Sequence, residues 1–285
     1  MCTLCHLKEQ AHAARAASGL WSARRAFVLA AGASAASAAL AQVEVGKLST
    51  IRKLVPADQL EAAAAKQYAQ MMAEAQSKRA LVPQDHPQML RLRAIANRIV
   101  PHAAPWNDRA KNWRWEINLI SSKQINAFCM PGGKIAFYTG ILDQLKLSDD
   151  EAAMIMGHEM AHALREHARE RVAKSSATSM GLSIGAQLLG LGQLGDVAAN
   201  LGTQLLTLKF SREDESESDL VGLDLAARAG YLPSASVTLW QKMSAASGNN
   251  GTSFLSTHPS GPERIATLRD NVPKVQRLYE AARKG

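Results

Sequence analysis

The sequence predicts an α+β domain that is mostly helical and contains a small mixed β-sheet. Alanine- and leucine-rich stretches, separated by Gly, Pro and capping residues, predict helices over most of the chain. Two short runs near the middle of the chain have the composition of strands. Apolar residues make up 47% of the 285 residues, so a sizeable core is available.

The first half of the chain is predicted to form two helices followed by two strands. Residues 56–78 have helix-forming composition, and a second helix spans residues 86–100, before Pro101. Residues 113–119 alternate apolar and polar side chains, which is typical of a strand. Residues 135–139 form a second strand after a Gly-Gly turn.

The second half is predicted to be helical. The expected helices span residues 149–174, 213–229, 234–246 and 262–284. Pro273 is expected to interrupt the last of these, and residues 248–251 are expected to form a loop.

Residues 180–208 are rich in Gly, Leu and Ala, but polar side chains interrupt the run. We therefore expect buried or loosely packed helices over the functional site, acting as a mobile lid, rather than a membrane span.

The net charge of +8 is not concentrated in one stretch, and no basic stripe interleaved with aromatic residues is present. This excludes nucleic acid as an expected partner. The modest positive excess is compatible with peripheral contact with an anionic membrane surface at most.

Residues 1–41 are interpreted as a signal peptide. Arg24-Arg25 precedes an apolar stretch of about 15 residues, and a small-x-small pattern ends at Ala41. The arginine pair resembles a twin-arginine export signal. We therefore expect cleavage after Ala41 and a periplasmic location, with an uncleaved inner-membrane anchor as the alternative. The remaining chain has only Cys129, so no disulfide forms within it.

His158-Glu159-Met160-Ala161-His162 matches the H-E-x-x-H pattern of zinc peptidases. Residues four apart on a helix lie on the same face, so both histidines can reach one metal ion, with Glu159 beside it as general base. Ser148 and Glu151 predict a capping box at the start of this helix. The pattern therefore predicts one Zn²⁺ per chain.

A catalytic zinc ion needs a third protein ligand. His167 stands one position off the spacing of one zinc-peptidase subclass, and on a continuous helix it would point away from His162, so we expect it to face solvent or to form a local hydrogen bond. An acidic stretch offers Glu213, Glu215 and Glu217. Spacing alone does not choose among them, but Glu215 would share a helix face with Asp219, and Asp219 could orient a ligand histidine.

Four motifs now indicate a resemblance to a known family. They are Asn126-Ala127-Phe128-Cys129-Met130-Pro131-Gly132-Gly133, the H-E-x-x-H segment, Ser211-Arg212-x-x-Glu215-x-Glu217-x-Asp219-x-x-Gly222, and Thr257-His258-Pro259 with Pro262-Glu263-Arg264-Ile265. In this order they resemble the HtpX and CaaX-prenyl-protease type of zinc metallopeptidase, a gluzincin family with a zincin-like fold, nearest to soluble periplasmic members of the BepA and LoiP type.

The resemblance implies a role for each matching residue. It assigns Glu215 as the third zinc ligand and Asp219 as the residue that orients a ligand. It places His258 and Arg264 at the site, where they would stabilise the oxyanion of the reaction, and His258 could instead occupy the open zinc position and hold the enzyme latent.

The segment at residues 126–138, which contains Asn126 and Gly133, is expected to form the edge strand that binds substrate. The chain would then divide into the signal peptide, an N-terminal helical region at residues 42–110 and a catalytic core at residues 111–285.

These expectations define a function. The chain would be a zinc-dependent metalloendopeptidase of the bacterial cell envelope that hydrolyses peptide bonds of misfolded or unassembled proteins, in protein quality control. The alternative is a chaperone or assembly factor for outer-membrane proteins, in contact with the outer-membrane assembly machinery, whose protease activity is secondary or latent.

Overall fold

The structure is a computed structural model that describes residues 43–183, 205, 208–250, 253–259 and 261–284. The signal peptide expected at residues 1–41 and most of the expected lid at residues 180–208 lie outside the described residues. Residues 43–285 form one compact unit, and the expected helical region and catalytic core contribute to a common hydrophobic core within it.

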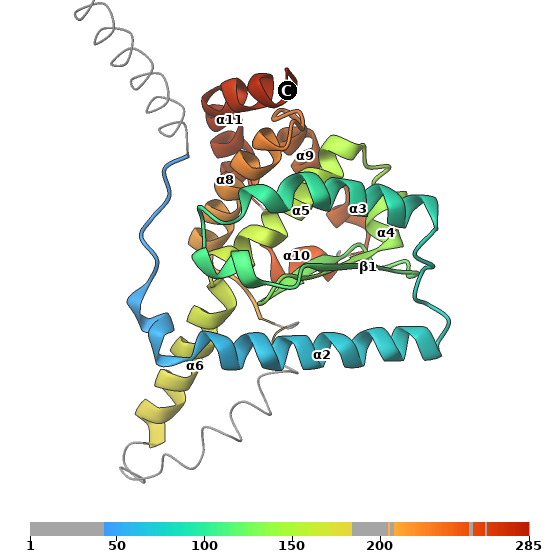
Figure 1. Cartoon of the computed structure of the whole chain (residues 1–285). Helices are drawn as coiled ribbons and strands as arrows, with labels where there is room; N and C mark the ends of the chain where they lie inside the picture. Colours follow the sequence, from blue (N-terminus) through green and yellow to red (C-terminus); the bar gives the residue numbers. More distant parts are fainter. Residues whose placement is uncertain (1–42, 184–204, 206–207, 251–252, 260, 285) are drawn as a thin grey trace, which may run out of the picture. The chain divides into compact units, whose positions relative to one another are not determined.

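The described chain is mostly helical (Figure 1). The helices of 13 or more residues are α2 (Ala57–Ser77), α3 (Pro87–Ile99), α5 (Asp149–Leu164), α6 (His167–Ser183), α8 (Arg212–Arg228), α9 (Ala235–Asn250) and α11 (Pro262–Ala282). Shorter helical elements are η1 (Thr50–Leu54), η2 (Val100–His102), η3 (Asp108–Asn112), α4 (Thr139–Gln144) and α10 (Ser253–Thr257).

Three strands form one mixed sheet in the order β1-β3-β2. Its strands are β1 (Glu116–Ile120), β2 (Ala127–Met130) and β3 (Lys134–Tyr138). The central strand β3 pairs parallel with β1 and antiparallel with β2. Strand β2 therefore forms one edge of the sheet.

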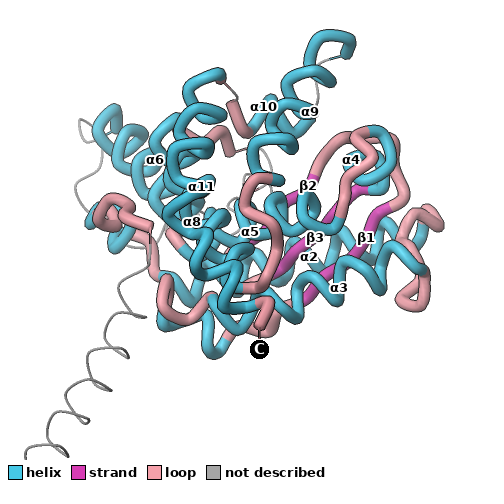
Figure 2. Tube along the Cα trace, turned by 90° about the horizontal axis from the view of Figure 1, so that it is seen from above, coloured by secondary structure: helices cyan, strands magenta, loops and turns pink. Residues whose placement is uncertain are grey.

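Helices cover both faces of the sheet. Along β3, Ile135 and Phe137 point into the core formed with α3 and α5, whereas Ala136 packs with α2. This alternation is the period of two that a strand imposes on its side chains. Figure 2 shows the same arrangement from above, with α2 and α3 following the direction of the strands.

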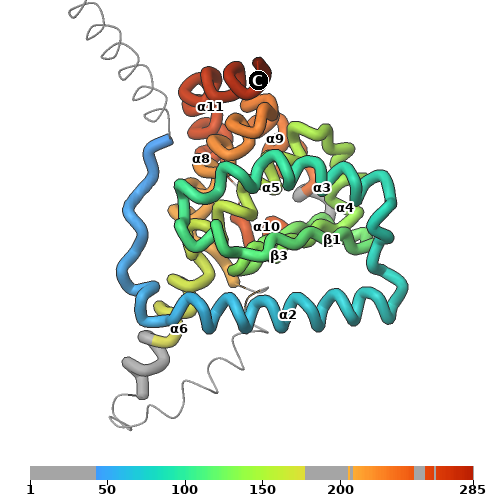
Figure 3. Tube along the Cα trace, in the orientation of Figure 1, coloured from blue at the N-terminus to red at the C-terminus, as the bar shows by residue number. Residues whose placement is uncertain are grey.

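The C-terminal helices pack against the centre of the molecule. Helix α5 lies against α8, and α8 in turn lies against α11, as Figures 1 and 3 show. Nearly every residue of α5 is buried, including its polar side chains. The helix is therefore the element around which the remaining site elements are arranged.

The helix expected at residues 149–174 is two helices, because the chain turns at Arg165 and Glu166. Glu166 has a φ of 58°, in the left-handed region that interrupts a right-handed helix. Its carboxylate pairs with Arg52 at 2.6 Å and with Arg169 at 2.9 Å, and these contacts hold the turn. Neither Gly nor Pro marks the position, so local sequence signals did not reveal it.

Two other expectations about the C-terminal helices were wrong. Helix α9 continues to Asn250 through the expected loop, because a single glycine costs a helix only about 1 kcal/mol. Helix α11 is continuous across Pro273. The proline frees the carbonyl of residue 269, and Arg269 is exposed, so water can satisfy that group.

Candidate active site

Helix α5 places His158 and His162 one turn apart. The helix begins with the predicted capping box, in which Ser148 and Glu151 each bond the other's backbone N–H. The Nε2 atoms of the two histidines lie 3.1 Å apart, and both side chains are buried. One helix therefore presents two imidazole nitrogens to the same point in space.

Helix α8 brings Glu215 to this point. Its Oε2 lies 3.5 Å from His158 Nε2, and its Oε1 lies 3.4 Å from His162 Nε2. The other two acidic candidates lie elsewhere, since Glu213 is exposed and Glu217 contacts His167 and Arg165. Of the three candidates, Glu215 is therefore the one that lies beside both histidines.

The two helices approach closely because both have glycine at the crossing point. A Cβ atom on Gly157 would lie 2.7 Å from the backbone oxygen of Gly222, and a Cβ on Gly222 would lie 2.6 Å from the backbone nitrogen of His158. Any side chain here would force the helices apart. The glycine pair is therefore a condition for the short distances between Glu215 and the two histidines.

His258, which follows α10, completes the cluster. Its Nδ1 lies 3.0 Å from Glu215 Oε1, and its Nε2 lies 3.7 Å from Glu159 Oε1. His158, His162, Glu215 and His258 are all buried, and one potential ligand atom from each lies within 4.8 Å of the others. Imidazole nitrogens and a carboxylate oxygen are ligands that zinc accepts, so the donor set fits this ion.

Asp219 lies behind His158 on α8, one turn after Glu215. Its Oδ1 is 3.0 Å from His158 Nδ1 and accepts a hydrogen bond from Trp240 Nε1. An Nδ1–H donated to Asp219 leaves Nε2 of His158 free as a ligand atom, which is the arrangement of a metal-binding histidine.

Arg264 of α11 contacts Asp219 and Glu215 rather than the cleft described below. Its Nε and Nη2 donate to Asp219 at 2.7 and 2.8 Å, and its Nη1 lies 2.7 Å from Glu215 Oε2. The guanidinium also stacks over the ring of Trp240 at 3.6 Å from the centroid. With these contacts, Arg264 is placed to hold the two carboxylates, and the expected direct role at the oxyanion stays a prediction.

Burial and neighbouring charges shift the pKa values of the cluster. Burial lowers the pKa of His162 well below its ordinary value. Burial acts in the same direction on His158, but hydrogen bonds with Asp219 and Glu215 outweigh it and raise the pKa of His158 to about 9. Burial also opposes ionisation of Glu215, yet the histidines around it hold its pKa well below the usual range.

Glu159 lies at the surface of the cluster that faces the cleft. Burial raises the pKa of its carboxyl group. Its Oε1 is buried and accepts no hydrogen bond from the described residues. This oxygen, whose nearest ionic neighbour is His258 at 3.7 Å, is available to accept a hydrogen bond from a water molecule at the site.

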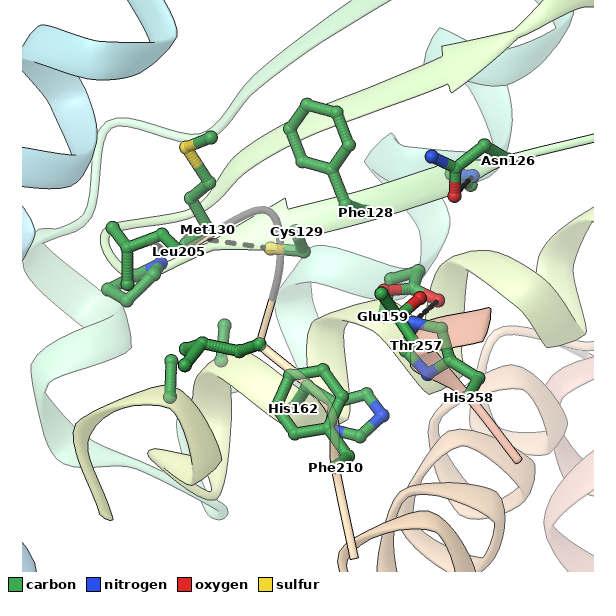
Figure 4. A pocket seen from close by; sticks show the side chains of 15 residues that line it. Asn126, Phe128, Cys129, Met130, Glu159, His162, Leu205, Phe210, Thr257 and His258 are labelled. Carbon is green, nitrogen blue, oxygen red and sulfur yellow. Dashed lines mark hydrogen bonds and ion pairs between the residues drawn. The ribbon is translucent and has the colours of Figure 1, made fainter. Parts of the chain in front are cut away.

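A cleft runs between the cluster and the edge strand β2 (Figure 4). Its lining includes Glu159, His162 and His258 on one side and residues 126–131 on the other. Most of the remaining lining is apolar, namely Ala163, Ala168, Leu205, Leu208 and Phe210. Cys129 also lines the cleft, where burial raises the pKa of its thiol.

The two residues expected to bind substrate differ in position. Asn126 lines the cleft immediately before β2, and its carbonyl accepts the N–H of Tyr138. Gly133 lies in the turn between β2 and β3, where its φ is 76° and a Cβ would lie 2.8 Å from Trp115. Gly133 therefore shapes the turn. The expectation of one edge strand over residues 126–138 was wrong, because the chain turns at Gly132 and Gly133, so that residues 127–130 form the edge strand and residues 134–138 the central one.

For His167, the environment expected from the sequence differs from the one observed. It is buried, and its Nδ1 lies 3.0 Å from Nδ1 of His162. The expectation assumed that the first helix continues, whereas His167 begins a new one after the turn at Glu166. Of the two expectations, solvent exposure is wrong and a local hydrogen bond is correct.

This fold and cluster define a zincin-like metallopeptidase domain, with H-E-x-x-H on one helix and a glutamate on a later one. The sequence pattern of Peptidase family M48 matches residues 88–272. The chain belongs to this family.

The relatives that the chain resembles in sequence belong to the same class of protein. The mitochondrial metalloendopeptidase OMA1 of Schizosaccharomyces pombe is 36% identical over 199 residues, which are 69% of this chain and 56% of the relative. OMA1 of Arabidopsis thaliana is 35% identical over 176 residues, 60% of this chain and 35% of the relative. The metalloprotease LoiP of Escherichia coli is 28% identical over 207 residues, 70% of this chain and 76% of the relative.

These relatives and the family support a metalloendopeptidase. LoiP was among the relatives expected from the sequence motifs, and the mitochondrial OMA1 proteins match at higher identity. The chain spans about a third to three fifths of the length of the two OMA1 proteins.

Proposed function

We propose that the chain is a zinc-dependent metalloendopeptidase of the bacterial cell envelope that cleaves misfolded or unassembled proteins. The observation that supports this most directly is the buried cluster of His158, His162 and Glu215, with Glu159 beside it at a cleft bordered by a sheet edge. Three protein ligands and a neighbouring carboxylate are the components of a hydrolytic zinc site.

His158, His162 and Glu215 would hold the zinc ion. When bound, zinc acts as a Lewis acid on the carbonyl group of the scissile peptide bond and lowers the pKa of a water molecule. Binding requires Nε2 of both histidines to be unprotonated, and the contact between Asp219 and Nδ1 of His158 favours that tautomer.

Glu159 would transfer the proton of the reaction. Its carboxylate takes a proton from the attacking water as the water oxygen bonds to the carbonyl carbon. It then gives this proton to the amide nitrogen as the C–N bond breaks, so that the amine leaves neutral. Burial raises the pKa of Glu159, which makes its carboxylate a stronger base towards the attacking water.

The edge strand β2 would bind the substrate. No described strand pairs with its outer edge, which faces the cleft. An extended peptide can add to such an edge through main-chain hydrogen bonds, and its side chains alternate between the cleft and solvent. This mode of binding recognises the peptide backbone rather than particular side chains, and it requires an unfolded segment. It therefore supports misfolded proteins as the substrate class.

The apolar lining of the cleft adds a preference for side chains. Ala163, Leu208 and Phe210 line the cleft together with His162, and Phe210 stacks on the ring of His162. We therefore expect an apolar residue next to the scissile bond. Mass spectrometry of the casein fragments produced by the full-length chain would show apolar residues enriched beside the cleavage points, and a random distribution would contradict this expectation.

The substrate class can be tested with one protein in two states. Lactalbumin with its disulfides reduced and blocked is unfolded, whereas native lactalbumin has no extended segment to offer. We expect the zinc-loaded chain to cleave the unfolded form and to leave the native form intact, and EDTA to abolish cleavage. Equal cleavage of both forms would contradict selection for unfolded chains.

The envelope location is supported by the signal-peptide pattern of residues 22–41. Within the described residues, no helix has both the length and the apolar character needed to cross a membrane. N-terminal sequencing of the protein recovered from the periplasm should begin at Gln42. Recovery in the membrane fraction with residues 1–41 retained would favour the inner-membrane anchor.

A further inference from the structure

The second ligand histidine has its own polar support, which differs from that of the first. His158 contacts a carboxylate directly, through Asp219. His162 instead contacts another histidine, His167, at 3.0 Å between the two Nδ1 atoms. Both histidines are buried. A buried imidazole pair of this kind requires a defined placement of protons, because two N–H groups or two lone pairs facing each other would repel.

The ligand role of His162 determines which ring nitrogen of each histidine carries a proton. If Nε2 of His162 faces the metal, its proton lies on Nδ1 and is donated to Nδ1 of His167. The remaining proton of His167 then lies on Nε2, which is 2.9 Å from Oε2 of Glu217. Each donor thus faces an acceptor, from the metal ligand to the carboxylate.

The carboxylate at the end of this series is itself fixed. Arg165 donates through Nη2 to Oε1 of Glu217 and also to the backbone oxygen of Gly46. Arg165 is buried, and Glu217 is one fifth exposed, at 19% of its side-chain surface. Ser218 adds a hydroxyl group 3.3 Å from Nδ1 of His167. The surroundings therefore restrict the rotation of the His167 ring.

A second contact restricts the ring of His162 from its face. Phe210 stacks on His162 with ring centroids 3.9 Å apart and an interplanar angle of 27°. The stacked ring fixes the plane of His162 but does not select a tautomer, because a phenyl ring neither donates nor accepts along the Nδ1 direction. Selection of the tautomer requires the hydrogen bond that His162 donates to His167.

We propose that His167 is a positioning residue that, together with Glu217 and Arg165, fixes the tautomer and ring orientation of His162 as a metal ligand. The proposal rests on the proposed function, since it assigns His162 to the metal. The turn at Glu166 makes this arrangement possible, because it starts α6 at His167 and returns that side chain to the cluster.

The test uses the full-length chain with His167→Leu, His167→Gln and Glu217→Gln, beside His102→Leu as the control. His102 is a half-buried histidine in η2, outside the metal cluster. Zinc affinity is measured by competition with a chromogenic chelator, and the ligand geometry is followed by the visible absorption of the cobalt-substituted protein. Thermal unfolding of the metal-free proteins reports whether each variant folds.

We expect His167→Leu to lower zinc affinity about 10- to 100-fold and to change the cobalt spectrum, as removal of a histidine's hydrogen-bond partner does at other metal sites. His167→Gln should recover most of the affinity, because its amide can accept from His162 and donate to Glu217. Glu217→Gln should lower the affinity several-fold while the protein still folds. His102→Leu should match the wild type.

Wild-type affinity and spectrum in His167→Leu would overturn the proposal. Equal losses in His167→Leu and His167→Gln would also overturn it, because they would indicate packing rather than a hydrogen bond. A wild-type chain that binds zinc but cleaves no peptide would contradict the proposed function alone, since affinities and spectra would still decide the role of His167.

Discussion

His258 gives the metal cluster a fourth donor, which has a consequence for activity. Structural zinc sites have four protein ligands, whereas catalytic sites keep one position for water. His258 belongs to the group whose ligand atoms lie within 4.8 Å of one another. The sequence left two roles open for His258, namely stabilisation of the oxyanion and occupation of the open zinc position. The arrangement favours the second role, in which His258 holds the enzyme latent.

Replacement of His258 by alanine should therefore increase casein cleavage several-fold and lower zinc affinity. The physical reason is that the variant exposes a position for water while it removes one donor. The initial rate of cleavage and the chelator-competition affinity measure the two effects. A drop in rate at unchanged zinc affinity would contradict the latent role and support His258 as a donor to the reaction.

At the residue scale, helical spacing was sufficient to predict that His158 and His162 lie together, whereas their role as ligands stays a prediction. His158, Glu159 and His162 follow from one pattern on one helix. Glu215 required more, because three glutamates shared the segment and only the position of Asp219 and the family motifs distinguished them. His167 could not be placed, since its direction depends on a turn that neither Gly nor Pro signals.

At the scale of elements, the crossing of α5 and α8 depends on a pair of glycines. A methyl group on Gly222 would meet backbone atoms of α5 at 2.6 to 2.9 Å. Gly222→Ala should lower the free energy of unfolding by about 1–3 kcal/mol, the usual cost of overpacking. It should also lower zinc affinity, because separation of the helices moves Glu215 away from the histidines.

Chemical denaturation and chelator competition measure these two losses. Gly261→Ala is the matched control, because a Cβ at Gly261 meets no atom within 4 Å. An alanine at residue 222 with wild-type stability and affinity would show that the helices can relax without cost to the cluster.

The capping box of α5 predicts a pH dependence of stability. Glu151 bonds the N-terminus of the helix and pairs with Lys242 at 2.6 Å. Burial acts against ionisation of Glu151, but Lys242 and the cap outweigh it and lower the pKa of the carboxyl group below its value of 4.5. A lowered folded-state pKa stabilises the fold above the unfolded value, and this stabilisation is lost as the pH falls through the folded value.

Glu151→Gln should therefore be less stable than the wild type at pH 7 by roughly 1–2 kcal/mol. The difference should shrink as the pH falls below 4.5 and through the lowered pKa of Glu151 in the folded protein. Urea denaturation of both metal-free proteins at several pH values measures it, since chelation removes the separate pH dependence of the metal site. A difference that stays constant from pH 7 to pH 3 would contradict ionisation of Glu151 as its source.

Elements were predictable where start and stop signals agreed with the burial pattern. The capping box of α5 and the alanine-rich composition of α2 are such cases. The predicted interruption of α11 at Pro273 was wrong. The rule that proline ends a helix does not consider that water can bond the carbonyl group that the proline frees. Strand pairing also depends on contacts distant in sequence, so the order β1-β3-β2 could not be read from local patterns.

At the scale of the whole molecule, the metal ion should be a major source of stability. Its proposed ligands come from α5 and α8, and His258 from the segment after α10, so binding would join three parts of the chain. A ligand present at 100 times its dissociation constant adds about 2.7 kcal/mol. For a chain of this size, we expect EDTA to lower the unfolding temperature by roughly 5–10 °C.

Differential scanning fluorimetry with and without EDTA measures this shift. The double variant His158→Ala/His162→Ala is the control, since it lacks two ligands and should show no shift. A shift of the same size in the double variant would place the stabilising metal elsewhere.

The whole fold was predictable as a class but not as an arrangement. Helical composition and two short strand signals gave α+β, and both the helices and the sheet are present. The link between the N-terminal segment and the site was not predictable. Arg52 and Gly46 reach the turn at Glu166 and Arg165 through contacts separated by more than 100 residues. Such contacts depend on the assembled fold.

The central claim is that Glu159 performs proton transfer at a zinc-dependent peptidase site. The most direct measurement is casein cleavage by the zinc-loaded full-length chain, Glu159→Gln and the exposed control Glu213→Gln, with bound zinc quantified in each. We predict stoichiometric zinc in all three, wild-type cleavage in the control, and a loss of about 10²- to 10⁴-fold in Glu159→Gln. Cleavage by Glu159→Gln at the wild-type rate would contradict the account.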